Sequence, residues 1–186
     1  MIARRQLPPN ESLLVIPLFS RHVALLDETE ATLVAQYGPL AAKSADYEFS
    51  HTSFYAKDMG PELRKRILIF EQLRPADILP QVKRWTIRIE DVAAEPGRYP
   101  EKRPLNLDPG LLQLAKFVLA TTKDRDHRIY LGDGIYAEVT LRFQGNQFEP
   151  WPWTYADYRE EAIRNFLRDA RNELHRRLVY NRSLGA

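Results

Sequence analysis

A charged stretch just before a glycine-rich turn holds the side chains best suited to bind an anion. Lys123, His127 and Arg128 lie close together in it, and a Gly-Asp-Gly turn follows at 132–134. An arginine can hold two oxygens of a phosphate or carboxylate at once, a lysine adds a point charge, and a histidine can donate or accept a proton near neutral pH. The stretch therefore predicts an anion-binding site in which Lys123 and Arg128 neutralise charge and His127 is the candidate catalytic residue.

The strands that flank this turn predict which side chains share the site. With a three-residue loop, Tyr130 faces Tyr136 and Arg128 faces Glu138 on one polar face of a β-hairpin. We expect the two tyrosines to line the site and Glu138 to orient Arg128. The apolar side chains that alternate with them are expected to face the core: Ile129, Leu131, Ile135, Ala137, Val139, Leu141 and Phe143. The alternative is that Arg128 and Glu138 form a surface ion pair, worth less than about 1 kcal/mol.

Asn106 and Asp108 are two further ligand-binding candidates, because they end a strand predicted over 104–107. Ligands often bind beside the ends of strands. Asp108 is followed by Pro109, a pair typical of a helix N-cap and first helical position, so we predict a helix that runs to about residue 118. As a cap, Asp108 would occupy the backbone N–H groups that a phosphate needs, which counts against phosphate binding at this helix start.

Metal binding has little support in the sequence. The four histidines lie far apart and form no short ligand pair. A composite site of His51, Asp108, His127 and Glu138 would form only if folding brought these residues together, so we assign no metal ligand.

The last predicted helix offers an alternative function. Four basic side chains, spaced four, three and four residues apart, form a ridge opposite its apolar stripe: Arg164, Arg168, Arg171 and His175. Such a ridge could contact RNA or a protein partner through its charge. Acidic residues interleave with it, which favours a solvated helix face instead. A non-enzymatic interaction module is therefore the second hypothesis, and nucleic acid is the less favoured partner.

Four aromatic residues precede or open that helix: Trp151, Trp153, Tyr155 and Tyr158. They could stack on a base or a sugar. Clamping the helix to the sheet is the favoured interpretation, because aromatic side chains dominate core burial.

Composition narrows the class of protein. The 186 residues are 44% apolar and 28% charged with a net charge of +2, which is ordinary for one globular domain and does not indicate nucleic-acid or membrane binding. The absence of cysteine excludes disulfides and thiol chemistry. The apolar run 13–19 contains Pro17 and is too short for a membrane span or a signal peptide, so a cytoplasmic protein is expected. No P-loop sequence is present to cradle nucleotide phosphates, and no cofactor is indicated.

An α+β fold must position these side chains. Strands are predicted at 13–19, 47–55, 67–70, 104–107, 129–131 and 135–143, with a return through Phe148. Helices are predicted from an Asp27/Glu30 capping box to Gly38, from Pro75 to Glu95, from Pro109 to 118, and over 155–182, where Thr154 and Asp157 supply the cap. The first six elements follow the β-α-β-β-α-β order of a ferredoxin-like core, extended by an antiparallel meander and a long C-terminal helix. We expect one domain over 1–186 with a loose segment at 1–11.

Two longer stretches resemble a known protein family. One is "LNLDPGLLQLAKFVLATTKDRDHRIYLGDGIYAEVTLRF" with "FEPWPWTYADY" after it, and the other is the upstream "SHTSFYAKDMGPELRKRILIFEQL". Both are similar to the domain of unknown function family DUF4416, and the resemblance covers nearly the whole chain. It implies a single soluble domain with no established activity. Within the matching motifs we single out Tyr55, with Asn106, Asp108 and the hairpin residues, as ligand-binding candidates.

Overall fold

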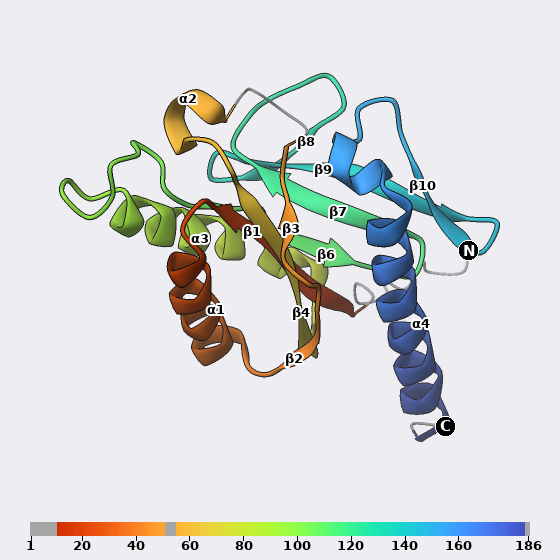
Figure 1. Cartoon of the computed structure of the whole chain (residues 1–186). Helices are drawn as coiled ribbons and strands as arrows, with labels where there is room; N and C mark the ends of the chain where they lie inside the picture. The colour runs from red at the N-terminus through yellow and green to blue at the C-terminus, as the bar shows by residue number, and fades with distance from the viewer. Residues whose placement is uncertain (1–10, 51–54, 185–186) are drawn as a thin grey trace.

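The computed structural model describes residues 11–50 and 55–184, and it shows a large antiparallel sheet with helices on both faces (Figure 1). The sheet runs in the order β10-β9-β7-β6-β1-β4-β2, with β3 beside β4, β5 beside β1 and β8 beside β9. Its strands are β1 (Ser12–Ser20), β2 (Leu40–Lys43), β3 (Tyr47–Glu48), β4 (Arg64–Arg74), β5 (Asn106–Leu107), β6 (Gly110–Leu112), β7 (Lys116–Thr121), β8 (Ile129–Gly132), β9 (Ile135–Gln144) and β10 (Gln147–Pro150).

The helices divide between the two faces of the sheet. They are α1 (Val23–Tyr37), α2 (Ala56–Met59), α3 (Leu79–Ala93) and α4 (Glu161–Leu184), with 3-10 turns η1 (Ala76–Ile78) and η2 (Ala156–Arg159). Side chains of β1 alternate between two cores, because Leu14 and Ile16 pack with α1 and α3 whereas Leu13 and Val15 pack with α4. The predicted combination of a mixed helix and sheet fold with a C-terminal helix is confirmed.

The central strand β1 also positions residues of the predicted site. Phe19 pairs with Asn106 of β5, and the carbonyl of Pro17 accepts a hydrogen bond from the Asp108 N–H at 3.0 Å. Every residue of β1 is buried. Asn106 and Asp108 are therefore held beside one end of a strand that is buried along its whole length.

The predicted helix after Asp108 is wrong, because two strands, β6 and β7, stand in its place. Successive apolar residues there face opposite cores: Leu111 packs on the side of α3 and Leu112 on the side of α4. A strand buried on both faces is apolar at consecutive positions. Such a run also contains apolar residues three and four apart, so it was interpreted as a helix. Gly110 permits the pairing, since a Cβ there would lie 2.3 Å from the carbonyl oxygen of Val118. Asp108 therefore caps no helix.

Two further predicted elements need correction, and one strand was not predicted. Helix α1 begins at Val23 rather than at the Asp27 capping box, because Asp27 and Glu30 instead pair with Arg66 at 2.7 Å each. The strand predicted over 47–55 is described only at β3, part of the prediction (51–54) lies outside the described residues, and β2 was not predicted.

The last helix begins later than predicted. Helix α4 starts at Glu161, after the separate turn η2. The hydroxyl of Thr154 donates to the Thr140 carbonyl at 2.5 Å and accepts from the Trp151 N–H, so it ties the segment to β9 and does not cap α4. The predicted apolar stripe of α4 is confirmed, with Ile163, Leu167 and Leu174 buried.

The β8–β9 hairpin has the predicted Tyr130–Tyr136 register, but its apolar side chains do not share one face. The β7–β9 pairing shifts register near Thr140, and this bulge redirects the side chains that follow it. Ile135 consequently packs on the side of α3, whereas Leu141 packs on the side of α4. Ile129 is 70% exposed and does not face the core.

Candidate functional site

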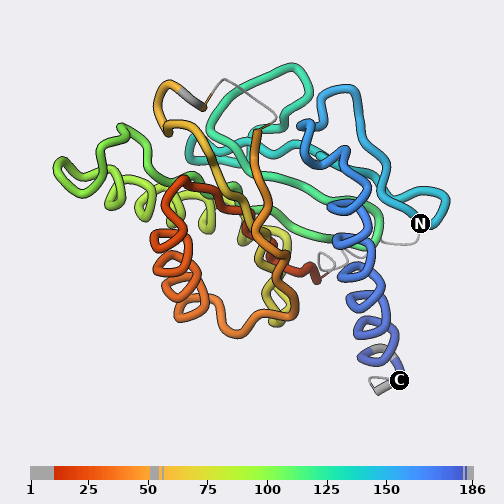
Figure 2. The backbone as a smooth tube through the Cα atoms, viewed as in Figure 1, coloured from red at the N-terminus to blue at the C-terminus, as the bar shows by residue number. Residues whose placement is uncertain are grey.

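A cavity of about 550 Å³ opens at one end of the sheet. Tyr55, just before α2, the loop between β7 and β8, and η2 all line it, although they come from distant parts of the chain, whose path Figure 2 traces. Residues of β1, β4, α3, β5 and β7 complete the walls of the cavity. The polar side chains that line it are Tyr55, Lys65, Lys83, Glu90, Arg103, Asn106, Asp108, Thr121, Thr122, Lys123, Arg125, Arg128, Tyr155, Asp157 and Tyr158.

The lining of the cavity carries an excess of positive charge. Six of the lining side chains are lysine or arginine and three are carboxylates. Each carboxylate lies near one cation: Asp157 with Lys65 at 2.6 Å, Asp108 with Lys83 at 3.7 Å and Glu90 with Arg103 at 3.7 Å. The other three cations, Lys123, Arg125 and Arg128, all come from the β7–β8 loop. Arg128 is paired with Glu138 from behind the lining, so Lys123 and Arg125 make this loop the positive end of the cavity.

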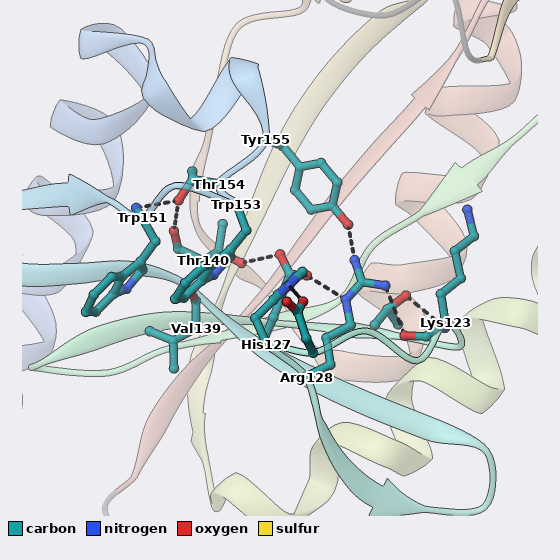
Figure 3. A network of polar contacts seen from close by, with 12 residues as sticks. Lys123, His127, Arg128, Val139, Thr140, Trp151, Trp153, Thr154 and Tyr155 are labelled. Carbon is teal, nitrogen blue, oxygen red and sulfur yellow. Dashed lines mark hydrogen bonds and ion pairs between the residues drawn. The ribbon is translucent and has the colours of Figure 1, made fainter.

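Arg128 is fixed on three sides (Figure 3). Its Nε donates to Glu138 Oε2 at 2.8 Å, its Nη1 to the Lys123 carbonyl at 2.9 Å and its Nη2 to the Tyr155 hydroxyl at 3.0 Å. The Arg128 and Glu138 side chains are only 7% and 1% exposed. The ion pair is therefore buried, in contrast to the surface pair considered from the sequence.

The Tyr155 hydroxyl is a hydrogen-bond donor at the cavity wall. Its oxygen accepts the N–H of Arg128, which leaves its own hydrogen for another acceptor. Burial raises the pKa of Tyr155 well above its usual value, and the charge of Glu138 adds to this shift while Arg128 opposes it. Tyr155 therefore keeps its proton at any physiological pH.

The opposite wall carries a second polar group of residues. Asn106 donates its Nδ2–H to Asp108 Oδ2 at 2.7 Å and accepts a hydrogen bond from Arg103. Lys83, which is buried on α3, donates to the Leu107 carbonyl at 2.6 Å. The strand end predicted from the sequence is thus tied to α3 through a lysine.

Glu90 completes this wall from α3. Its Oε1 accepts the backbone N–H of Leu107 at 2.5 Å. Burial raises the pKa of Glu90 above its usual value, although Lys83 and Arg103 nearby lower it. This wall is therefore close to charge balance, with two carboxylates facing two cations.

The floor of the cavity holds a buried lysine inside an aromatic cage. Lys65 Nζ lies 4.7 Å from the ring centroids of both Phe49 and Tyr158 and 5.6 Å from that of Phe19. The Lys65 and Asp157 side chains are 3% and 2% exposed. This pair joins β4 to η2 and fixes the segment that carries Tyr155.

Five of the predicted site residues line the cavity and four do not. Those that line it are Tyr55, Asn106, Asp108, Lys123 and Arg128. Glu138 lies behind Arg128, while Tyr130 and Tyr136 pack on each other, with ring centroids 5.1 Å apart, and are absent from the lining. Tyr130 is largely exposed.

His127 also lies outside the cavity. Its ring stacks on Trp153 with centroids 5.2 Å apart, and Trp153 stacks in turn on Trp151 at the same spacing (Figure 3). Its nitrogens lie 3.0 Å from Asp126 Oδ1 and 3.3 Å from Glu138 Oε2. His127 therefore contacts the residue that holds Arg128 and does not itself face the enclosed space.

Sequence reasoning missed the residues that the cavity takes from α3 and β4. Lys83 and Glu90 are seven positions apart on α3, which places them on one face beside the apolar stripe. Lys65 lies two residues before the apolar run of β4, which begins at Ile67. The sequence did contain a signal for these residues: each is a charged residue on the face of its helix or strand that also carries buried side chains.

Comparison with known proteins gives one result. The family model "Domain of unknown function (DUF4416)" matches residues 10–174 of the 186-residue chain. The chain belongs to this family. No match was found among curated proteins or among solved structures. For this DUF4416 member the geometry of the site is therefore the basis for reasoning about function.

Two arginines of the basic ridge on α4 are engaged within the DUF4416 fold. Arg164 donates to the Phe148 carbonyl at 3.1 Å. Arg171 donates to the Leu114 carbonyl at 3.1 Å and lies 4.0 Å from the centroid of the Phe143 ring. These contacts attach α4 to the sheet.

Neither a cluster of metal ligands nor a membrane-spanning helix is found among the described residues of this DUF4416 chain. Of the four residues in the composite metal site, His51 lies outside the described residues. Within residues 11–50 and 55–184 no three His, Asp or Glu side chains are grouped to hold a metal ion. No helix in the described part of the chain has the length and apolar character needed to cross a bilayer.

Proposed function

We propose that this protein binds a small anionic ligand, such as a nucleotide or another phosphorylated compound, in the cavity between the β7–β8 loop and α3. The observation that supports this best is the excess of cationic over acidic side chains in the lining. The volume of about 550 Å³ falls within the usual range for small-molecule sites.

Phosphate is the group that this end of the cavity suits. Arg128 is immobilised by Glu138 and Tyr155, and a preorganised arginine loses little entropy when it binds an oxyanion. Arg125 is exposed on the same loop and adds a second charge. Tyr155 supplies a neutral donor, so charge and hydrogen bonding act on the same group of the ligand.

The remaining predicted site residues do not contact the phosphate in this proposal. Asn106, Asp108 and Tyr55 face the part of the ligand that lies away from the loop. A proton-transfer role for His127 stays a prediction, and its contacts suit a positioning role through Glu138. Tyr130 and Tyr136 stay predictions as ligand-binding residues.

A thermal-shift experiment tests the proposal. The probes are inorganic phosphate, pyrophosphate, AMP and succinate. A ligand that binds only the folded state adds about 2.7 kcal/mol of stability at a concentration 100 times its Kd. We expect phosphorylated probes to raise the melting temperature of the wild-type protein, and the double variant Lys123→Gln/Arg125→Gln to lose more than half of that rise.

The matched control is Arg88→Gln. Arg88 is an exposed arginine of α3 that does not line the cavity. This variant should respond to the probes as the wild-type protein does. The proposal is wrong if no probe raises the melting temperature, or if the double variant and the control respond equally.

We also infer that the first part of the chain forms a ferredoxin-like βαββαβ core. In support, β6, β1, β4 and β2 are adjacent in that order, and all their pairings are antiparallel. Helix α1 connects β1 to β2, α3 follows β4, and both helices contribute to the same core. This arrangement matches the split βαβ motif.

A further inference from the structure

We propose that the ligand is a sugar phosphate or a similar phosphorylated polyol, whose hydroxyl group binds between Asp108 and Lys83 at the wall opposite the cationic loop. This inference rests on the proposed function and goes beyond it, because it names the chemistry of the part of the ligand that is not phosphorylated.

The first observation is an unused acceptor on Asp108. Its Oδ2 accepts from Asn106, but among the residues that the structure describes Oδ1 accepts no hydrogen bond, and Lys83 Nζ lies 3.7 Å from it. The Asp108 side chain is 31% exposed, and it lines the cavity. A carboxylate oxygen in this position favours a ligand group that can donate a hydrogen bond.

The second observation is that Lys83 offers donors at the same place. The Lys83 ammonium is buried, and it donates to the Leu107 carbonyl, which uses one of its three N–H groups. The distance of 3.7 Å between Nζ and Oδ1 is longer than a hydrogen bond. A hydroxyl beside this pair can accept from Nζ and donate to Oδ1 at once, which a group that only donates or only accepts cannot do.

Charge balance at this wall favours a hydroxyl over an amine. Glu90 and Asp108 face Lys83 and Arg103 there, so the wall is nearly neutral. An ammonium group would be attracted by the carboxylates and repelled by the two cations. A neutral hydroxyl satisfies both members of the Asp108–Lys83 pair without adding charge.

The two ends of the cavity therefore differ in the chemistry that they recognise. The β7–β8 loop presents cations, with the Tyr155 hydroxyl as a neutral donor beside Arg128. The α3 wall presents the Asp108–Lys83 pair. A ligand with a phosphate at one end and a hydroxyl at the other satisfies both, and an alkyl phosphate of the same length satisfies only the first.

Calorimetric titration of the full-length protein with three probes tests this inference. The probes are ribose 5-phosphate, n-pentyl phosphate and ribose. We expect ribose 5-phosphate to bind about tenfold or more tightly than n-pentyl phosphate, because a hydrogen bond to a charged group contributes at least this factor. Ribose alone should bind far more weakly than either phosphate.

The variant Asp108→Asn removes the carboxylate but keeps an oxygen that can accept from Asn106. We expect it to reduce the preference for ribose 5-phosphate over n-pentyl phosphate to less than threefold. Glu149→Gln is the control, because Glu149 pairs with Arg142 outside the cavity, and it should leave the preference unchanged.

The outcomes separate the two proposals. If the wild-type protein binds n-pentyl phosphate and ribose 5-phosphate within threefold of each other, the hydroxyl inference is overturned and phosphate binding stands. If none of the phosphates binds, or if ribose binds as tightly as its phosphate, the proposed function itself fails. The wild-type comparison decides the matter even if Asp108→Asn does not fold.

Discussion

The Arg128–Glu138 pair differs from most cross-strand ion pairs in its burial, with side chains that are 7% and 1% exposed. Arg142 and Glu149 form a pair on the neighbouring strands that is much more exposed, at 44% and 29%. Removal of one partner from a buried pair leaves a charge without compensation, whereas an exposed charge is solvated by water. The two pairs therefore form a matched comparison within one sheet.

We predict that Arg128→Gln lowers the free energy of unfolding by about 3 kcal/mol, the usual effect of breaking a buried pair. Arg142→Gln should lower it by less than about 1 kcal/mol. Urea unfolding of both variants measures the difference. Equal losses would show that the Arg128–Glu138 pair is accessible to water.

Buried tyrosines predict how stability depends on alkaline pH. Burial raises the pKa of Tyr37 and of Tyr55 from 10.0 to about 12, and the charge of Arg74 opposes the shift at Tyr37. Between about pH 10 and pH 12 the unfolded chain loses these protons while the folded protein keeps them. The folded state then binds more protons, so the free energy of unfolding falls as pH rises through this range.

Urea unfolding across that range, followed together with phenolate absorbance, measures this effect. Tyr37→Phe should reduce the alkaline loss of stability, because it removes one of the tyrosines whose pKa is raised by burial. Stability that stays constant up to pH 12 would contradict the prediction, as would complete phenolate formation while the protein is still folded.

At the scale of elements, the attachment of α4 to the sheet depends on arginines that were expected from the sequence to lie on a solvated helix face. Arg171 donates to the Leu114 carbonyl and covers the Phe143 ring. We predict that Arg171→Ala lowers the free energy of unfolding by about 1–2 kcal/mol through the lost hydrogen bond and cation–π contact. Thermal or urea unfolding measures it.

Arg176 supplies the control for Arg171. It lies on the same helix with a side chain that is 75% exposed, and it forms an ion pair with Glu173, which is on α4 itself. Arg176→Ala should leave the free energy of unfolding unchanged within error. If the two variants lose stability equally, α4 is attached to the sheet by its apolar stripe alone.

Elements with strong local signals could be predicted from the sequence. The Gly-Asp-Gly turn fixes the β8–β9 hairpin and its Tyr130–Tyr136 register, and Gly38 ends α1 with a φ of 91°, a backbone conformation that glycine adopts readily. The segment after Asp108 could not be assigned, because a strand buried on both faces has no alternation to distinguish it from a helix. The bulge near Thr140 has no signal in the sequence, although it decides which core Leu141 joins.

At the scale of the whole molecule, the site depends on which elements the sheet order brings together. The cations of the β7–β8 loop could be predicted because they are neighbours in sequence. Lys83, Glu90 and Lys65 could not, because they face the loop only once β1 lies between β4 and β5 and α3 crosses the same end of the sheet. The sequence therefore indicates the β7–β8 loop and the strand end at Asn106 and Asp108, but not the side chains that α3 and β4 add to the cavity.

A crystal structure of the protein with pyrophosphate, at a concentration that saturates its thermal shift, would show whether the cavity is the anion-binding site. We expect a phosphate group inside the cavity, with oxygens within hydrogen-bond distance of the Arg128 and Tyr155 side chains. An empty cavity with pyrophosphate bound elsewhere, for example along the arginines of α4, would contradict it.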